Sequence, residues 1–306
     1  MEKVAAWKKQ PVKGLWWIIV SILLSILYMQ VVAPALGISY ADAGMNYPAM
    51  FFFWAFAWIS LFEYWPFGHL KQPWTGLASA VLCWILSVVS WGWLSRLMDP
   101  YAAVALVMYA LFPLFLLAWF SDYLPAAMPM PQPLKGIFLS VACVVIAWVV
   151  YTQIGAIPQM WLYFMPMFFA PFFDGWPVAD PKYNRLIKLV FWTVMFLALT
   201  WLFDYVHVLA GAPMSGALGS DFECLVWAGM TPLYVFEMAG RGKQPSHGIL
   251  LTVVTYVLTA VFAFLYWRVL RLPEWWASTW VFVWWVWIIV VQFLPYPWPS
   301  EPPSEA

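Results

Sequence analysis

Long apolar stretches alternate with short polar segments along the whole chain, and this alternation is its dominant pattern. Each stretch has about the length that an α-helix needs to cross a bilayer, roughly 20 residues. We therefore expect an all-α integral membrane protein. The stretches that predict its ten transmembrane helices cover residues 15–36, 48–66, 74–95, 101–121, 135–154, 158–173, 184–208, 222–237, 247–269 and 275–295.

The polar segment before every second apolar stretch carries the same short motif. Gln-Pro-x-x-Gly begins at residues 10, 72, 132 and 244, and a degenerate copy, Asp-Pro-Lys-Tyr-Asn, begins at 180. These starts are 62, 60, 48 and 64 residues apart, which indicates an internal repeat of about 60 residues. Proline is favoured in the first turn of a helix, and glycine allows a neighbouring backbone to approach closely. The motif is therefore expected to start the first helix of each repeat.

This period predicts five parallel helical hairpins within one transmembrane domain, residues 1–294. The chain after that domain, 295–306, is rich in proline and glutamate and is expected to be disordered. The predicted repeats cover roughly residues 10–71, 72–131, 132–179, 180–243 and 244–294.

An acidic residue follows the second apolar stretch of each of the first four repeats. A carboxylate at a helix C-terminus opposes the helix dipole, so a cationic partner is expected for each. The nearest cations along the chain stand at the start of the next repeat. We therefore predict structural latches that join Glu63 to Lys71, Asp122 to Lys135, Asp174 to Lys182, and Glu237 to Arg241 or Lys243. A docking surface for a cytoplasmic partner is the alternative interpretation.

Composition and charge place these helices in a membrane and orient them. Hydrophobic residues make up 65% of the chain and charged residues 9%, against about 45–50% and 25% in soluble proteins. Eleven of the fourteen lysines and arginines fall on the side of the repeated motif. The positive-inside rule makes that side cytoplasmic, with both termini there. We expect an integral protein of a bacterial cytoplasmic (inner) membrane, with lipid and protein subunits but no nucleic acid as partners.

A polar cluster is expected at the outer membrane surface. Asp204 and His207 share one helix face, and a loop rich in glycine, alanine and serine links them to the next acidic pair. Such groups could form a proton-transfer or metal site; the alternative is that they pair with arginines at the headgroups. The candidate cluster comprises Asp204, His207, Asp221, Glu223, Arg268 and Arg271. No catalytic or metal-ligand set is assigned to it.

Aromatic residues are unusually frequent, with 25 Trp, 24 Phe and 15 Tyr. Several tryptophans fall inside the predicted spans: Trp54, Trp58, Trp280, Trp284, Trp285 and Trp287. An aromatic groove would suit a flat apolar ligand such as a quinone, a pigment or a lipid tail, whereas ordinary packing is the alternative. Haem held between two histidines is not expected, since the chain has only three histidines. A bound lipid or quinone is therefore the only cofactor type that the sequence favours.

Three functions remain open. The neutral centres of the spans and the aromatic content favour a non-catalytic anchor or accessory subunit of a larger, possibly redox, membrane complex that contacts a hydrophobic ligand. A permease or channel for a small neutral or hydrophobic solute is the first alternative. An integral enzyme acting on a lipid or isoprenoid, through the outer polar cluster, is the second.

Overall fold

The fold is all-helical in the part of the chain that the structure describes. The computed structural model describes residues 11–71, 74–120, 124–155, 172–173, 175–180, 182–209, 236, 243–265, 269–271, 283–284, 286–287 and 289–290. Every element within these ranges is a helix. Four of the helices described are long and apolar enough to cross a membrane: Val12–Ala35, Trp74–Leu97, Pro100–Ala118 and Leu134–Ile154. The predicted all-α class is thereby confirmed for the described residues, and these four helices have the length and apolar composition of membrane spans.

The helices follow the apolar stretches closely, because a helix in lipid must satisfy its own backbone hydrogen bonds. The main ones are α1 (Val12–Leu27), α3 (Tyr47–Ser60), α4 (Trp74–Leu97), α5 (Pro100–Phe115), α7 (Leu134–Ile154), α9 (Arg185–Leu209) and α11 (Ser246–Phe264). Shorter pieces are α2 (Ala33–Ala35), α6 (Leu124–Ala127), a 3₁₀ turn at Phe67–His69 and π-helical segments at Tyr28–Val32, Asp42–Asn46 and Leu116–Phe120.

The second predicted span ends earlier in the structure than the apolar pattern indicates. The stretch 48–66 is helical only as far as Ser60, because the chain turns at Glu63 and Tyr64, whose φ angles are +53° and +61°. The stretches 158–173, 222–237 and 275–295 lie wholly or largely outside the described residues, as does the tail 295–306.

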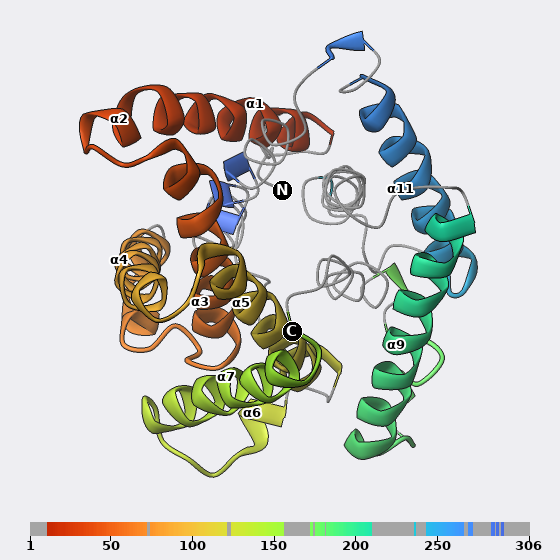
Figure 1. Ribbon diagram of the computed structural model, residues 1–306. Coiled ribbons are helices and arrows are strands. Elements are labelled where there is room, and N and C mark those ends of the chain that lie inside the picture. Colours follow the sequence, from red (N-terminus) through yellow and green to blue (C-terminus); the bar gives the residue numbers. More distant parts are fainter. Residues whose placement is uncertain are drawn as a thin grey trace, which may run out of the picture.

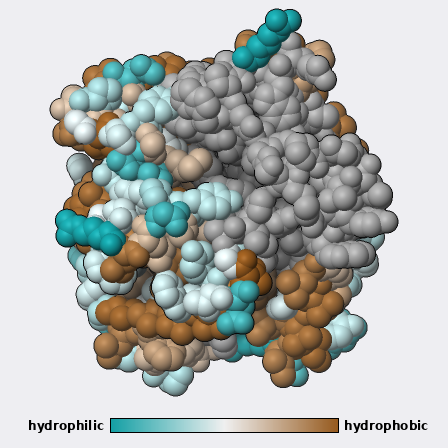
Figure 2. All heavy atoms as spheres, in the orientation of Figure 1, coloured by the Kyte–Doolittle hydropathy of each residue, from teal (hydrophilic) through white to brown (hydrophobic). Residues whose placement is uncertain are grey.

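The described helices form an outer and an inner layer. In Figure 1, α1, α4, α7, α9 and α11 lie around the edge of the molecule, and α3 and α5 lie closer to its middle. Only 22% of the most apolar part of α4 is buried, against 78% of the corresponding part of α5. Apolar side chains of the outer helices gather as brown patches at the edge of the molecule, over α7 and the lower part of α9 (Figure 2). An exposed apolar surface of this kind marks contact with lipid or with another protein.

The inner faces of the outer helices are built from small residues. On α4 and α7 these residues recur at every third or fourth position, which places them along one helix face, and on α1 the buried Trp17 stands between Gly14 and Ser21. Hydroxyl groups among them bond to their own helix: Ser25 donates to the Ser21 carbonyl over 2.7 Å. Small side chains let membrane helices pack closely against the inner layer. The buried examples are Gly14, Ser21 and Ser25 on α1, Gly76, Ser79, Cys83 and Ser87 on α4, and Gly136, Ser140, Cys143 and Ala147 on α7.

Candidate functional site

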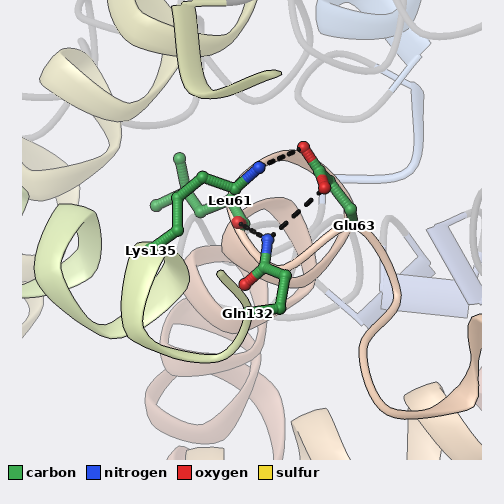
Figure 3. Close-up of polar contacts among 4 residues, drawn as sticks. All are labelled: Leu61, Glu63, Gln132 and Lys135. Atoms are coloured by element: carbon green, nitrogen blue, oxygen red, sulfur yellow. Dashed lines mark hydrogen bonds and ion pairs between the residues drawn. The ribbon is translucent and has the colours of Figure 1, made fainter. Parts of the chain in front are cut away.

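The first polar junction joins the end of α3 to the start of α7 (Figure 3). Lys135 Nζ donates to Glu63 Oε1 over 2.8 Å, and Gln132 Nε2 donates to the Leu61 carbonyl over 2.8 Å. The same amide lies 3.5 Å from Glu63 Oε2. Lys135 is only 5% exposed, so this carboxylate stabilises an ammonium group that is largely removed from water. The contacts hold together two segments about 70 residues apart in sequence.

A glycine and a phenyl ring complete this junction. The ring of Phe62 packs directly on Gly136, the last residue of the third motif. A Cβ atom at position 136 would lie 2.6 Å from Cε1 and Cγ of that ring, which is closer than real Cβ atoms approach. The glycine of the motif is thus required by a side chain of another hairpin.

The second junction has the same design, between residues 172–173 and the start of α11. Gln244 Nε2 donates to the Phe172 carbonyl over 3.0 Å, and Phe173 packs on Gly248 as Phe62 packs on Gly136. Gln244 Oε1 also accepts from the Gly248 N–H over 3.2 Å. The glutamine therefore caps its own helix while it holds the end of an earlier segment.

The chain turns after each of these phenylalanines in the same way. Trp65 N–H donates to the Phe62 carbonyl over 2.9 Å, and Trp176 N–H donates to the Phe173 carbonyl over 2.8 Å. One residue in each turn has a positive φ angle at the matching place: Tyr64 at +61° and Gly175 at +75°. The two loops are therefore structural equivalents, 111 residues apart by subtraction of their numbers (173 and 62).

The predicted latch between Glu63 and Lys71 is wrong. Glu63 pairs with Lys135, for which Asp122 was the expected partner, and Lys71 is exposed. The physical reason is that the end of α3 packs against the start of α7, whereas proximity along the chain favoured the start of α4. Residues at the ends of neighbouring elements in sequence need not be neighbours in space.

The remaining latch residues fall in two groups. Lys182, expected at Asp174, pairs with Asp180 of its own motif over 3.2 Å on an exposed surface. The pKa of the Asp180 carboxyl is held below its usual value, first by the Lys182 backbone N–H and then by the Lys182 ammonium group. Lys243 is exposed. The predicted latch residues Asp122, Asp174, Glu237 and Arg241 lie outside the described residues.

An apolar cavity of about 370 Å³ lies between the π-helical segment Tyr28–Val32 of the first span, α3, α4 and the segment 283–290. Its volume falls in the range of about 300–1,000 Å³ that is typical of small-molecule sites. The residues that line it are Tyr28, Val32, Leu36, Ile38, Pro48, Phe51, Leu77, Ala80, Val81, Trp84, Ile85, Val283, Val286, Trp287 and Val290. We take this cavity as the candidate functional site.

Helix irregularity positions the aromatic part of this cavity. The first span changes from α-helix to π-helix at Tyr28–Val32, and both end residues of that segment line the cavity. Such π-helical turns are frequent at functional sites. The Tyr28 ring lies edge-on to Trp84, with 5.4 Å between ring centroids, and to Trp287 at 6.4 Å.

The cavity opens toward the exposed apolar surface between α4 and the end of the first span. Residues of its lining on α4 and just after the first span are also exposed at the surface: Leu36 by 69%, Val81 by 60% and Ile85 by 52%. A molecule dissolved in the bilayer would meet no polar barrier among these side chains. The geometry thus fits lateral access from the membrane.

The predicted outer polar cluster is only partly placed. Asp204 and His207 belong to α9, so they share a helix as expected, but their side chains lie outside the described residues. Arg271 is exposed, with a φ angle of +50°. Asp221, Glu223 and Arg268 lie outside the described residues. The proton-transfer, metal and headgroup interpretations of this cluster remain predictions.

Sequence reasoning anticipated Trp287 as a groove residue but missed Tyr28 and Trp84. It also missed a small polar network beside the cavity residue Ile38, in which Ser39 Oγ donates to Asp42 Oδ2 over 2.7 Å and Asn46 Nδ2 donates to Asp42 Oδ1 over 2.9 Å. No motif marks these residues, since a tyrosine in an apolar run is ordinary. The turn to a π-helix, which assembles them, has no clear signature in sequence.

Within the described ranges, no three histidine, cysteine or acidic residues come close enough to hold a metal ion. Comparisons with protein-family models, with curated proteins and with solved structures find no similar protein. Function is therefore argued from the cavity and from the scaffold around it.

Proposed function

We propose that this protein is a non-catalytic accessory subunit of a membrane complex, which holds a lipid-soluble ligand within a scaffold of five helical hairpins. The scaffold would have ten transmembrane helices with both termini on the cytoplasmic side, in a bacterial inner membrane. The proposal has two parts, the scaffold and the ligand site, and different observations support each.

A constant register between hairpins supports the scaffold. The end of the first hairpin contacts the start of the third through Glu63 and Lys135. The segment Leu116–Phe120, which ends the second hairpin, lies against α9 of the fourth. Phe172 and Phe173 of the third contact Gln244 and Gly248 of the fifth. Each hairpin thus meets the one two places later, as equivalent repeats would.

Continuing this register requires that the hairpins close into a ring. The segment 283–290, near the end of the fifth hairpin, packs against the first span: Trp287 contacts Tyr28, and Val283 shares a buried cluster with Tyr28 and Ala33. In a closed ring, the end of the fourth hairpin would meet the first motif. The residues brought together would be Glu237 and Lys13, in the positions of Glu63 and Lys135.

We predict that Lys13 forms an ion pair with Glu237. Lys13 is only 7% exposed, and a buried ammonium group requires a nearby negative charge. Lys13→Gln is expected to lower the free energy of unfolding by about 1–2 kcal/mol. The substitution loses the attraction to Glu237, and the smaller cost of burying the charge, which also disappears, offsets only part of that loss. Thermal unfolding in detergent, followed by tryptophan fluorescence, measures the change.

A double-mutant cycle distinguishes this pair from the neighbours in sequence. Lys13→Gln and Glu237→Gln should be non-additive by about 0.5–3 kcal/mol, whereas Lys243→Gln and Glu237→Gln should add. Additivity in the first cycle would show that the ring does not close in this register.

The apolar cavity carries the proposal for the ligand. It lies among spans that carry aromatic side chains, opens toward lipid, and is lined by apolar groups apart from the polar atoms of Tyr28, Trp84 and Trp287. Genuinely empty cavities of this size cost packing energy, and a lipid-soluble molecule would recover it. This single feature favours a binding subunit over a catalyst.

Filling the cavity should expel the ligand. Ala80 lines the cavity from α4, so a phenyl ring at that position would occupy its volume. We expect protein purified in mild detergent to carry an apolar molecule that organic extraction and mass spectrometry identify. Ala80→Phe should retain less than about a tenth of it, since overpacking by one side chain costs roughly 1–3 kcal/mol.

Val89→Phe is the matched control, because Val89 is 62% exposed on the same helix and does not line the cavity. Equal ligand content in the wild type, Ala80→Phe and Val89→Phe would contradict the proposed site. Solute flux into liposomes that contain the purified protein alone, blocked by Ala80→Phe, would favour the permease alternative. Copurification of further subunits would support the role in a complex.

A further inference from the structure

Two hydrogen-bond donors in the wall of the cavity have no partner. Among the residues that the structure describes, neither the Tyr28 hydroxyl nor the Trp287 indole N–H makes a hydrogen bond, although both atoms are buried. Tyr28 as a whole is 7% exposed. Buried donors are nearly always paired, and leaving one unpaired is costly. The two rings touch edge-on, so the donors belong to one aromatic cluster. A ligand atom that accepts hydrogen bonds would satisfy this cluster.

The shape of the cluster suits a flat ring. Trp84 contacts Tyr28 with 5.4 Å between ring centroids and contacts Phe51 at 5.5 Å. These rings and Trp287 line the cavity from the π-helical segment Tyr28–Val32, α3, α4 and the segment 283–290. Aromatic side chains pack favourably against the face or edge of another ring. The same cluster that offers the donors therefore offers stacking surfaces.

A second hollow continues the cavity along α4. This hollow of about 500 Å³ shares Leu77, Val81 and Ile85 with the cavity and extends to Trp74 and the loop residues Phe67 and Leu70. From Ile85 to Trp74 the helix rises about 16 Å, at 1.5 Å per residue. Its lining is entirely hydrophobic, and Trp74, Leu77 and Val81 are exposed toward lipid. Such a channel along a helix fits an extended hydrocarbon chain.

We propose that the ligand is a planar ring that bears a hydrogen-bond-accepting oxygen and a long apolar tail, as in a prenylated quinone. The ring lies in the aromatic cavity, where the Tyr28 hydroxyl and the Trp287 indole N–H donate to its oxygen. The tail follows α4 toward Trp74. This inference rests on the proposed ligand-binding function and adds the chemistry of the ligand to it.

Binding of defined probes to the full-length protein in phosphatidylcholine nanodiscs tests the assignment. The first probe is decylubiquinone, which has a ring and a ten-carbon tail. The second, tail-free probe is the benzoquinone with the same ring, in which a methyl group replaces the tail. We expect Tyr28→Phe to weaken decylubiquinone binding about two- to tenfold, as loss of one neutral hydrogen bond does. We also expect it to raise the carbonyl stretching frequency of the bound quinone in the infrared spectrum. Ala78→Trp, which narrows the hollow at a residue that does not line the cavity, should weaken decylubiquinone more than the tail-free probe.

The controls separate this inference from the broader function. Tyr101→Phe, at an exposed tyrosine outside the cavity, should leave both readouts unchanged. Equal affinity and equal carbonyl frequency in Tyr28→Phe and Tyr101→Phe would overturn the assigned hydrogen bond. If the purified protein carries only phospholipid, displaced by Ala80→Phe, and binds neither quinone, the ring assignment fails while ligand binding stands. If Ala80→Phe displaces nothing, the ligand site itself fails.

Discussion

Replacing Gly136 by alanine is expected to lower the free energy of unfolding by about 2–3 kcal/mol, although alanine favours a helix more than glycine does. The reason is the Phe62 ring, which lies where the new methyl group would stand, with a Cβ only 2.6 Å from two ring carbons. Phe62 is 6% exposed and belongs to the main buried cluster, so it has little room to move. Thermal or denaturant unfolding in detergent measures the change.

Two further variants test whether the effect of Gly136→Ala comes from the contact with Phe62. Gly92→Ala, on α4, introduces the same methyl group where no atom lies within 4 Å, and it should be neutral or slightly stabilising. Phe62→Leu combined with Gly136→Ala should recover part of the loss, because the smaller side chain vacates the contact. If Gly136→Ala behaves like Gly92→Ala, the close packing of the two hairpins described for this junction is incorrect.

Glu63→Gln is expected to destabilise the protein by about 2–3 kcal/mol. Its partner Lys135 is 5% exposed and would be left buried without a carboxylate beside it. Removing one member of a buried pair typically costs about 3–5 kcal/mol, and an exposed pair contributes about 0–1 kcal/mol. The Glu63 side chain is 37% exposed, so water offsets part of the loss and an intermediate value follows. The midpoint of thermal unfolding should fall accordingly.

A second set of variants tests whether Glu63 pairs with Lys135 or with Lys71. Lys135→Met combined with Glu63→Gln should be more stable than Glu63→Gln alone, because no buried charge then remains unpaired. Lys71→Met should have almost no effect, since Lys71 is exposed. A large effect of Lys71→Met, with additivity between positions 63 and 135, would restore the pairing of neighbours in sequence.

These predictions give the repeated motif a physical meaning that its sequence only suggested. In the third and fifth copies, glutamine holds a carbonyl group at the end of an earlier hairpin, and glycine receives a phenyl ring from it. In the third copy, lysine adds an ion pair. In these two copies the motif packs the start of one helix against an earlier segment of the chain, a role that needs no catalytic group.

Sequence reasoning succeeded where the determinant was local. Hydrophobic length and the Gln-Pro motif predicted the starts of α4, α7, α9 and α11 to within one residue of those observed. It succeeded less well at the end of α3, because the turn at Glu63 depends on positive φ angles that an apolar stretch does not reveal.

The sequence predicted the kind of site, an aromatic groove, but not most of the residues that form it. An abundance of tryptophan inside spans suggested an aromatic groove, and Trp287 does line the cavity. Tyr28 and Trp84 come from different helices, and the π-helical turn brings Tyr28 to the cavity. A titratable cluster attracts attention in a sequence, whereas an unpaired hydroxyl group becomes visible only in three dimensions.

By itself, the sequence determined that the chain is helical and apolar, and it indicated where helices begin, because these depend on backbone hydrogen bonding and transfer to lipid. The tertiary structure alone decided which hairpin meets which, since Glu63 and Lys135 are 72 residues apart and their pairing depends on how whole helices pack. It alone also decided that four helical segments enclose a cavity. Hydrophobicity along a chain specifies burial in a membrane, but the lipid-like interior leaves the choice of neighbours to shape and to a few polar contacts.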